Sequence, residues 1–573
     1  MSATLQEITE FVFDYVVIGG GTAGLTLAAR LSENPSISVA VLEVGQENFD
    51  EPKILIPGQF GATFGDPKFD WVFKTTKQQH SDDKSYMWSR GKGLGGSSAM
   101  NFCAWSKPPA FDIDAFEKLG NPGWNWESYH SYSKRSERFH PAIEEFAANK
   151  QNAFDPVSSG TSGPIQVTVP FFYDTLEALF QKTLANVGID RNDDPYGGDI
   201  NGAWTPISNY DPQTWTRSYA TTGYYLPNQA RENLKILTGA LVSRIILDET
   251  EDELQSASGV EFIHNGATHT VRVKKEVVVC AGAIKSPQIL ELSGIGRKDI
   301  LKRIGVDLKV NLPGVGENVQ EHHFSSMSFE LDPTAGHTTR DLLRNPLYAA
   351  EALKLHAEGK GPLRAGPGTA AFVPLSATTD EASTIIENIA RQVEDMKCKG
   401  GLAPGLAEQW DNPTCSFEGR LGSRHGVYTL SPFYDENFGA RGRQGLRDDY
   451  LRYQSSLLEG HHHLEILVQH MKFVRKLAAT EPWKSDIVRE VDPGLEVTTD
   501  EQMREYIKKY HSTAWHTVGS CSMLPRDKQG VVDPSLKVYG TSNVRVADLS
   551  IVPLHIAAHT QATAYMIGEK GTI

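Results

Sequence analysis

The chain of 573 residues is 39% hydrophobic and 22% charged, which is ordinary for a globular protein. Its 56 Lys and Arg residues against 71 Asp and Glu residues give a net charge of −15, which argues against nucleic acid or an anionic membrane as the main partner. A chain of this length is expected to form roughly two to four domains, or two domains that are interleaved in sequence.

The cysteines and the first residues indicate an intracellular protein. There are five cysteines, an odd number with no C-x-x-C pair, so a disulfide framework is not expected, although a single bridge remains open. The N-terminal residues have no basic start and include Glu7 and Glu10, unlike a secretory signal. No apolar run approaches the roughly 18 residues of a membrane span. We therefore expect a cytoplasmic protein that does not bind membranes.

Residues 15–43 are predicted to form a strand, a glycine-rich turn, a helix and a second strand. The turn is a G-x-G-x-x-G motif, formed by Gly19, Gly21 and Gly24. These glycines allow a tight turn, close approach of a pyrophosphate and close packing of helix on strand, and the helix N-terminus offers free N–H groups to the phosphates. Glu43 ends the second strand about 20 residues later, where a carboxylate accepts ribose hydroxyls and repels a 2′-phosphate. The unit therefore predicts a site for FAD or NAD rather than NADP.

Two later stretches complete a family pattern: GKGLGGSSAMNFCAWSKPPAFDID at residues 91–114 and GAIKSPQILELSGIG at residues 282–296. Similar stretches follow as NLPGVGENVQEH, TAWHTVGSCSM and GVVDPSLKVYGTSNVRVADLSIVP, at residues 311–322, 513–523 and 530–553. With the first βαβ unit, they give the chain a resemblance to the glucose–methanol–choline (GMC) oxidoreductases that covers most of its length. Glu321 departs from the pattern, because the family usually has Asp at this position.

The resemblance implies an α/β fold, in which a doubly wound FAD-binding domain is interleaved with an α+β substrate domain built on an antiparallel sheet. We expect residues 11–150, 216–325 and 511–573 in the FAD-binding domain, and residues 151–215 and 326–510 in the substrate domain. The resemblance also implies FAD as cofactor, a small-molecule alcohol or aldehyde hydrate as substrate, and oxygen or a quinone as electron acceptor.

The positions that hold FAD are also carried over from the family pattern. Residues 95–98, Gly-Gly-Ser-Ser, have little bulk, so their backbone could lie against a flat ring or a phosphate; a tight turn with a helix N-cap is the structural alternative. The resemblance places Asn101 at the flavin edge, the Val242 backbone at the adenine, and residues 548–549 at the pyrophosphate and ribityl chain. The full implied set is Gly19, Gly21, Thr22, Ala23, Gly24, Glu43, Arg90, Gly95, Gly96, Ser97, Asn101, Val242, Asp548, Leu549, Thr560 and Gln561.

His516 has three interpretations. It could be a packed core histidine, a zinc ligand with Cys521, or a general base, since a neutral imidazole can take a proton near pH 7. No second ligand pair of suitable spacing accompanies it, so no metal is expected. The resemblance implies that His516 is the base and that His559 hydrogen-bonds the same substrate hydroxyl. A helix predicted from about Thr560 to Lys570 would direct its positive end toward the flavin.

Three further segments carry expectations. Thr499 and Gln502 form a capping box, and the helix that follows is expected to bury Met503, Tyr506, Ile507 and Tyr510 on one apolar face. The run His461-His462-His463 is expected to be a solvated helix start rather than a metal site. Residues 425–460 lack the alternation of a half-buried strand, so we expect an altered or partly missing sheet element there.

The resemblance implies oxidation of an alcohol or aldehyde hydrate by hydride transfer to flavin N5, with His516 accepting the hydroxyl proton. Two other activities stay open. One is a lyase on the same fold that splits a cyanohydrin, because that reaction also needs a base. The other is a flavin-binding protein without redox turnover. Among the remaining histidines, His322 is expected to bind nothing.

Overall fold

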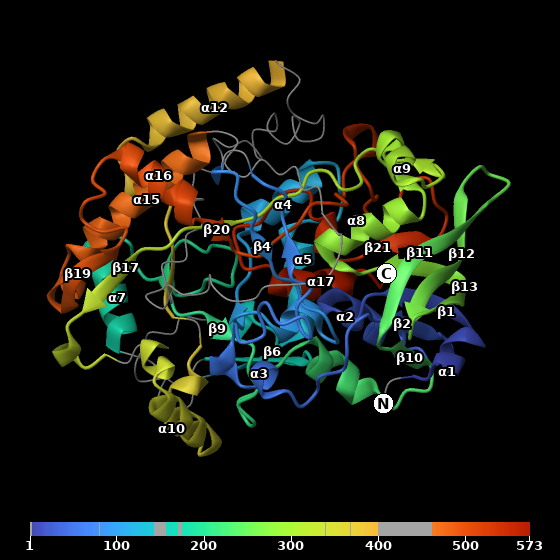
Figure 1. Cartoon of the computed structure of the whole chain (residues 1–573), viewed down its shortest axis with the longest axis horizontal. Coiled ribbons are helices and arrows are strands. Elements are labelled where there is room, and N and C mark those ends of the chain that lie inside the picture. Colours follow the sequence, from blue (N-terminus) through green and yellow to red (C-terminus); the bar gives the residue numbers. More distant parts are fainter. Residues whose placement is uncertain are drawn as a thin grey trace.

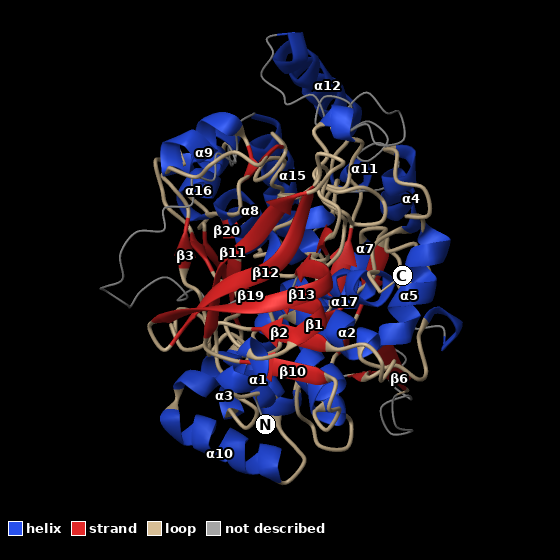
Figure 2. Cartoon of the chain, turned by 90° about the vertical axis from the view of Figure 1, so that its right-hand side faces the viewer, coloured by secondary structure: helices blue, strands red, loops and turns tan. Residues whose placement is uncertain are grey.

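The computed structural model describes residues 3–78, 81–141, 156–169, 175–337, 340–366, 368–398 and 461–572. Its centre is a mixed seven-stranded sheet in the order β10-β2-β1-β13-β12-β11, with β21 paired to β13 (Figure 2). The strands are β1 (Val12–Ile18), β2 (Val39–Leu42), β10 (Leu234–Leu237), β11 (Ala240–Glu249), β12 (Gln255–His264), β13 (Ala267–Val279) and β21 (Val544–Val546). Strands β10, β2, β1, β13 and β21 run parallel, whereas β11 and β12 are antiparallel additions. The α/β class is confirmed.

The predicted βαβ unit is present as β1, α2 (Thr22–Leu31) and β2. The four residues of β2 are fully enclosed, and β1 buries five of its seven, because helices cover the faces of this parallel sheet. Strand β1 lies beside β2 on one side and β13 on the other. The carboxyl end of β1, where the glycine turn begins, is therefore near the middle of the sheet edge, which is where ligands bind in open α/β folds.

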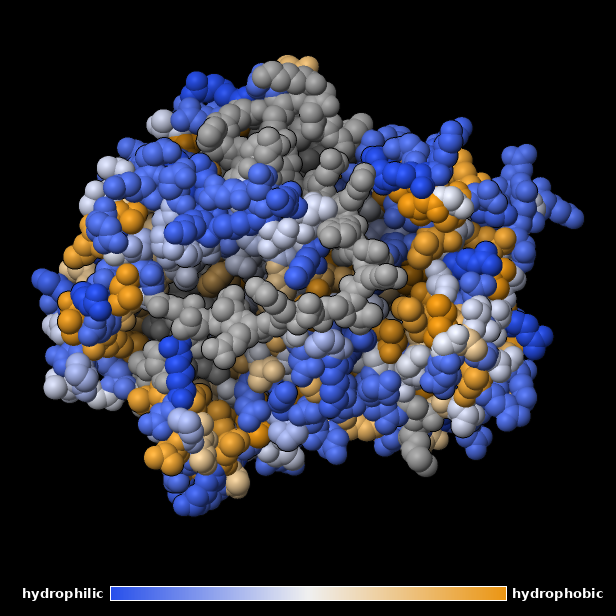
Figure 3. Space-filling view, in the orientation of Figure 1, coloured by the Kyte–Doolittle hydropathy of each residue, from blue (hydrophilic) through white to orange (hydrophobic). Residues whose placement is uncertain are grey.

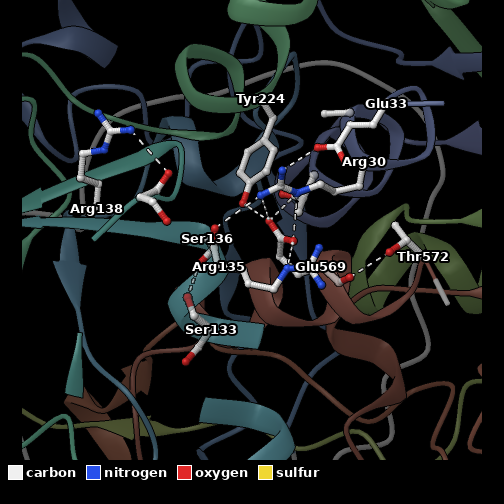
Figure 4. A network of polar contacts seen from close by, with 12 residues as sticks. Arg30, Glu33, Ser133, Arg135, Ser136, Arg138, Tyr224, Glu569 and Thr572 are labelled. Atoms are coloured by element: carbon white, nitrogen blue, oxygen red, sulfur yellow. Dashed lines mark hydrogen bonds and ion pairs between the residues drawn. The ribbon is translucent and has the colours of Figure 1, made fainter. Parts of the chain in front are cut away.

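Helix α17 (Gln561–Lys570) packs between α2 and α5 (Trp126–Ser136), so it lies against the helix of the first βαβ unit (Figure 1). One polar anchor near the end of α17 is Glu569, whose side chain has no exposed surface. Arg30 Nε and Nη2 donate to this carboxylate at 2.8–3.0 Å, and the Tyr224 hydroxyl donates at 2.8 Å (Figure 4). Arg135 adds an ion pair at 3.5 Å. These contacts hold the C-terminal end of α17, while its N-terminus points away from them.

A second region contains several small sheets. A four-stranded sheet joins β5 (Ala104–Trp105), β9 (Ile207–Ser208), β7 (Ile165–Thr168) and β6 (Glu137–His140). Two antiparallel pairs join β8 (Gly202–Trp204) to β18 (Ala370–Phe372), and β17 (Ser328–Leu331) to β19 (Ile487–Asp492). In the described part of this second region, antiparallel strands occur only in short sheets, so the sheet of the substrate domain and the domain boundaries stay predictions. The segment expected to be altered, residues 425–460, lies outside the described residues.

Helices cover this second region. They are α7 (Thr175–Asn186), α10 (Pro346–Ala357), α11 (Leu375–Thr378), α12 (Ala382–Cys398), α15 (His461–Ala478) and α16 (Asp500–Tyr510). Helices α12, α15 and α16 lie at the end of the molecule opposite the central sheet (Figure 1). The other helices are α1 (Leu5–Thr9), α3 (Pro52–Leu55), α4 (Ala110–Lys118), α8 (Gly282–Leu292) and α9 (Lys298–Ile304). The other strands are β3 (Phe73–Lys74), β4 (Met87–Trp88), β14 (Ile295–Gly296), β15 (Val310–Asn311), β16 (His323–Phe324) and β20 (Ser512–Thr513).

The predicted helix after Thr499 is α16, and its capping box with Gln502 is present. Met503 and Ile507 are buried against α15, as the spacing predicts, whereas Tyr510 is 54% exposed. The prediction was wrong for Tyr510 because it is the last residue of the helix, beyond the contact with α15. Helix α15 begins at His461, so the histidine run is its first turn.

The face seen in Figure 1 is mostly hydrophilic, with apolar side chains in separate patches (Figure 3). One patch lies over α10, where Leu347 is 82% exposed. In the part of the chain that the structure describes, no helix is long and apolar enough to cross a membrane. Four cysteines of this part, Cys103, Cys280, Cys398 and Cys521, carry free thiols.

The buried His470 of α15 should make stability depend on pH. Its Nδ1 donates to the Ile466 carbonyl at 2.6 Å, and burial lowers its pKa to about 3. Because the unfolded chain, with a histidine pKa of about 6.5, binds more protons, the free energy of unfolding decreases as the pH falls from 6.5 toward 3. This one group should lower the free energy of unfolding by about 2 kcal/mol at pH 5. Urea unfolding of wild type and His470→Leu at pH 7 and pH 5 should show a smaller pH effect in the variant, and equal pH effects would contradict the assignment.

Candidate active site

The glycine turn after β1 leaves open space in front of α2. A Cβ atom on Gly24 would lie 2.0 Å from the Gly19 carbonyl oxygen, so this glycine is required by close packing of the turn. A Cβ atom on Gly21 would meet only the Gly96 Cα atom, at 3.9 Å. Gly21 is also the N-cap of α2 and provides no side-chain cap. The helix N-terminus therefore faces a space that accepts an anionic group.

A second glycine loop closes against the first. Gly95 N–H donates to the Gly20 carbonyl at 2.8 Å. Gly96 has φ +51°, and a Cβ there would lie 2.8 Å from Gly21 Cα. Thus the glycines of the two predicted motifs, about 70 residues apart in sequence, lie against each other and form a stretch of wall without side chains. Such a wall lets a large flat or phosphorylated group approach the backbone.

Glu43 connects these loops. Its buried carboxylate accepts N–H bonds from Gly20 at 2.9 Å, Gly45 at 2.8 Å and Gly93 at 3.0 Å. Burial raises the pKa of Glu43, and the three N–H donors act in the opposite direction. A carboxylate has about four acceptor positions, so these bonds leave one for a ribose hydroxyl, the role predicted for Glu43.

Asp548 has the corresponding place after β21. Its buried side chain accepts bonds from Gly282 N at 2.9 Å, Ser286 Oγ at 2.5 Å and Ser550 N at 2.8 Å. It thereby joins the turn after β21 to the start of α8, which carries the GAIKSPQILELSGIG motif. Burial raises the pKa of Asp548, and these hydrogen bonds favour the charged form.

A chain of amide groups lies along one wall of the site. Asn101 donates through Nδ2 to Gln561 Oε1, and Gln561 Nε2 donates to Asn209 Oδ1 at 3.0 Å. Arg217, only 1% exposed, donates to Asn101 Oδ1 at 2.7 Å and to the Asn101 carbonyl at 2.8 Å. Asn101 and Gln561, both predicted at the flavin, are thus fixed relative to each other across 460 residues of sequence.

One cavity of about 840 Å³, within the usual size of ligand sites, brings many predicted residues together. The predicted residues on its wall are Thr22, Arg90, Ser97, Asn101, His516, Leu549, His559, Thr560 and Gln561. The predicted residues off this wall are Gly19, Gly21, Ala23, Gly24, Glu43, Gly95, Gly96, Val242 and Asp548. Val242 lies in β11, where the register with β12 shifts. Of the predicted residues in and next to the glycine turn, only Thr22 lines the cavity.

His516 and His559 face each other in this cavity. Their ring centroids are 5.3 Å apart, with ring planes at 81°. His559 lies just before α17, and Ser106 Oγ contacts its Nδ1 at 3.3 Å. Burial lowers the pKa of His559 to about 4. Burial, followed by the charges of His322, His559 and Arg90, lowers the pKa of His516 well below its usual value. Both rings are therefore neutral at pH 7.

Glu321 holds the His516 segment from behind the cavity. Its Oε1 accepts the backbone N–H groups of His516 at 2.6 Å and His322 at 3.0 Å. Its Oε2 accepts the Thr517 hydroxyl at 2.7 Å and forms an ion pair with Arg90 at 3.8 Å. The Glu321 side chain thus reaches backbone and side-chain donors together.

Several residues near His516 were missed in the sequence. His322 was expected to bind nothing, but its Nδ1 lies 2.9 Å from His516 Nδ1. His555 stacks on His322 at 3.8 Å. Ser106 was not considered, although it contacts His559. The only signal for His322 was its place within the NVQEH stretch. Among the described residues, no group of three or more His, Cys, Asp or Glu side chains could hold a metal ion.

Aromatic rings form another side of the cavity. Phe64 and Phe102 stack at 5.6 Å, and Trp515 meets Phe64 edge-on at 5.0 Å. All three rings line the cavity. Trp105 does not, because it is fully buried and donates to Glu137 at 2.6 Å.

Comparison with known proteins decides the family. The GMC oxidoreductase model matches its N-terminal part to residues 13–324 and its C-terminal part to residues 443–568. The chain is a GMC oxidoreductase. This GMC oxidoreductase is 34% identical to the GMC oxidoreductase family protein Mala s 12 of Malassezia sympodialis, over 97% of this chain and 91% of that protein. It is 31% identical to dehydrogenase citC of Monascus ruber, over 99% of this chain and 97% of that protein.

Solved structures agree with the fold of this GMC oxidoreductase. An FAD-dependent oxidoreductase from Chaetomium thermophilum superposes with a TM-score of 0.89 at 26% identity, and covers 98% of each chain. A fungal aryl-alcohol oxidase superposes with a TM-score of 0.81 at 25% identity, again over 98% of each chain. The GMC oxidoreductase is thus an FAD-dependent enzyme that acts on CH–OH donors, and FAD is its cofactor. The open glycine wall and the uncapped N-terminus of α2 fit the pyrophosphate of such a cofactor.

Proposed function

We propose that this GMC oxidoreductase oxidises an alcohol or aldehyde hydrate, with His516 as general base and His559 as a second hydrogen-bonding group for the same hydroxyl. One observation carries the proposal. Two neutral imidazoles, 5.3 Å apart, share a cavity wall with the residues predicted at the flavin. When bound, FAD supplies the acceptor for the hydride that leaves the substrate carbon.

The protein groups account for the proton. His516 Nδ1 is engaged by His322, so Nε2 is the atom left to accept the hydroxyl proton. His559 contacts Ser106 through Nδ1, so its Nε2 is left for the hydroxyl oxygen. The N-terminus of α17, with Thr560 and Gln561 on the cavity wall, stabilises negative charge that develops at this end of the site.

The walls favour an apolar, aromatic alcohol. Phe64, Phe102 and Trp515 lie at stacking distance from one another, and an aromatic substrate could pack against their faces and edges. Further apolar side chains line the same cavity; they include Leu176, Phe180, Phe324, Met327, Phe329, Leu467, Met471 and Trp483. The likeness to a structure named as an aryl-alcohol oxidase supports the same substrate class.

The direct test is anaerobic stopped-flow absorbance at the flavin's visible band. Holo-protein is mixed with separate pools of aryl, primary aliphatic and sugar alcohols. We expect bleaching by the aryl pool, and admission of air then distinguishes an oxidase, which reoxidises at once, from a dehydrogenase that needs a quinone. If no pool bleaches the flavin, the redox proposal fails. Aldehyde released from a cyanohydrin while the flavin stays oxidised would instead show a lyase.

The rate of flavin reduction should stay constant to unusually low pH. A base must be unprotonated to act, and a lowered pKa means that protonation occurs only at lower pH. With the pKa of His559 at about 4 and that of His516 well below its usual value, the acid limb should have its midpoint below about 6.5, the usual histidine value. Stopped-flow reduction at saturating substrate from pH 4.5 to pH 8 measures this midpoint. A midpoint at or above 6.5 would contradict neutral buried histidines.

A further inference from the structure

His322 contacts the proposed base through a nitrogen–nitrogen hydrogen bond. The two Nδ1 atoms are 2.9 Å apart, and the ring planes are nearly perpendicular, at 86°. Burial lowers the pKa of His322 well below its usual value, and the charges of His555 and His559 act in the same direction. Both rings are therefore neutral, and each has one N–H donor and one acceptor nitrogen. A single proton lies between the two Nδ1 atoms.

Two placements of that proton have opposite consequences. If His322 donates, then His516 Nδ1 is the acceptor, its own proton lies on Nε2, and Nε2 cannot accept a proton from a substrate. If His516 donates, its Nε2 carries a lone pair toward the cavity and is ready to act as a base. The tautomer of His322 therefore decides whether His516 can work.

The role proposed for His516 selects between these placements. Its Nε2 can accept a proton from a substrate only if the ring proton of His516 lies on Nδ1. The Nδ1 atom of His322, 2.9 Å away, is then the acceptor of that proton, and the proton of the neutral His322 ring lies on its own Nε2.

We propose that His322 is a positioning residue that accepts the Nδ1 proton of His516 and so holds His516 in the tautomer whose Nε2 is a free base. This inference rests on the proposed function of His516. It explains why an imidazole, rather than an apolar side chain, lies behind the base. Two structural supports keep His322 in place: the His555 ring stacked on it at 3.8 Å, and Glu321, which accepts its backbone N–H.

The first test compares two substitutions by anaerobic single-turnover reduction of the flavin. His322→Asn keeps an acceptor oxygen near the place of Nδ1, whereas His322→Leu is of similar size but has none. We expect His322→Leu to lower the limiting rate roughly 10- to 100-fold, part of the worth of a general base, with substrate affinity changed less than about threefold. His322→Asn should restore the rate to within about fivefold of wild type. His511→Leu, the same change at a buried histidine off the cavity wall, should not reproduce the loss.

Each result bears on the proposal. An equal loss in His322→Asn and His322→Leu would overturn it, because an acceptor alone would then be insufficient. An unchanged rate in His322→Leu would overturn it as well. FAD content and thermal unfolding of each variant show whether a loss comes from misfolding, and the His322→Asn rescue keeps the test valid if His322→Leu is unstable.

The second test needs no turnover. In protein labelled with ¹⁵N at histidine, the ring nitrogen shifts show which nitrogen of His516 carries the proton. We expect protonated Nδ1 and unprotonated Nε2 in wild type and His322→Asn, and a mixture in His322→Leu, with His516→Asn used to assign the signals. A proton on Nε2 of His516 in wild type would overturn the inference. This result stands even if no alcohol reduces the flavin, so failure of the proposed function and failure of the inference are distinguishable.

Discussion

Replacing His516 by alanine should lower the rate of flavin reduction roughly 10²- to 10⁴-fold, the usual worth of a general base. The reason is that His516, whose ring lies 5.3 Å from that of His559 on the described cavity wall, is the group proposed to accept the substrate proton, and alanine has no side chain that can do so. FAD binding should survive, because the glycine loops and Glu43 that are predicted to hold the cofactor do not contact the His516 side chain. Stopped-flow reduction and the FAD content of the purified variant give the two readings.

His511→Ala is the matched control for this substitution. His511 is five residues earlier in the same segment and is 4% exposed, but it lies off the cavity wall, against the Tyr86 hydroxyl at 3.0 Å. Removal of the His511 side chain should reduce stability and leave the rate of flavin reduction within a few-fold of the wild-type rate. If His516→Ala also loses FAD, His516 is structural and its assignment as base is wrong.

Gly21→Val should abolish FAD binding and leave a folded protein. The backbone of Gly21, at φ −81°, suits any residue, and a Cβ there would meet only Gly96 Cα at 3.9 Å. The added branches therefore have room within the protein but occupy the space in front of α2 that the pyrophosphate needs. Titration of apo-protein with FAD, followed by flavin fluorescence, measures affinity, and circular dichroism reports folding.

Gly24→Ala provides the contrast. Its Cβ would lie 2.0 Å from the Gly19 carbonyl oxygen, so it should destabilise the turn whether or not FAD is present. Gly21→Ala, with one carbon, should weaken FAD binding less than Gly21→Val. Normal FAD affinity in Gly21→Val would show that the cofactor does not approach this turn.

Local patterns predicted the elements that surround the site. The glycine turn, the strand before Glu43, the capping box at Thr499 and the helix from about Thr560 are all present, because each depends on residues within one or two turns of chain. The arrangement of the cavity is different in kind. His322 and His516 are 194 residues apart, and Asn101 and Gln561 are 460 apart. Spacing along the chain contains no information on such pairs.

The same limit explains why the hydrogen-bond partners of Glu43 and Asp548 could not be predicted from the sequence. The position of Glu43 at a strand end was predictable, because the dinucleotide pattern specifies an acid there, whereas that of Asp548 was implied by the family resemblance. Their partners were not, since the N–H groups of Gly93 and Gly282 come from distant loops. Both acids join loops that are distant in sequence, and only tertiary structure shows this role.

The central sheet also has a consequence for how the chain is made. Strand β1 starts at residue 12, but its neighbour β13 pairs with β21 at residues 544–546, and Arg30 of α2 meets Glu569. A ribosome that adds roughly 5–20 residues per second needs about half a minute to two minutes to reach these partners. Until then, the end of β13 that pairs with β21 has an unpaired edge and α2 lacks its cover from α17, and an unpaired edge is a site where aggregation can start. Expression at reduced temperature with added chaperones should therefore increase the yield of folded protein more than a stronger promoter would.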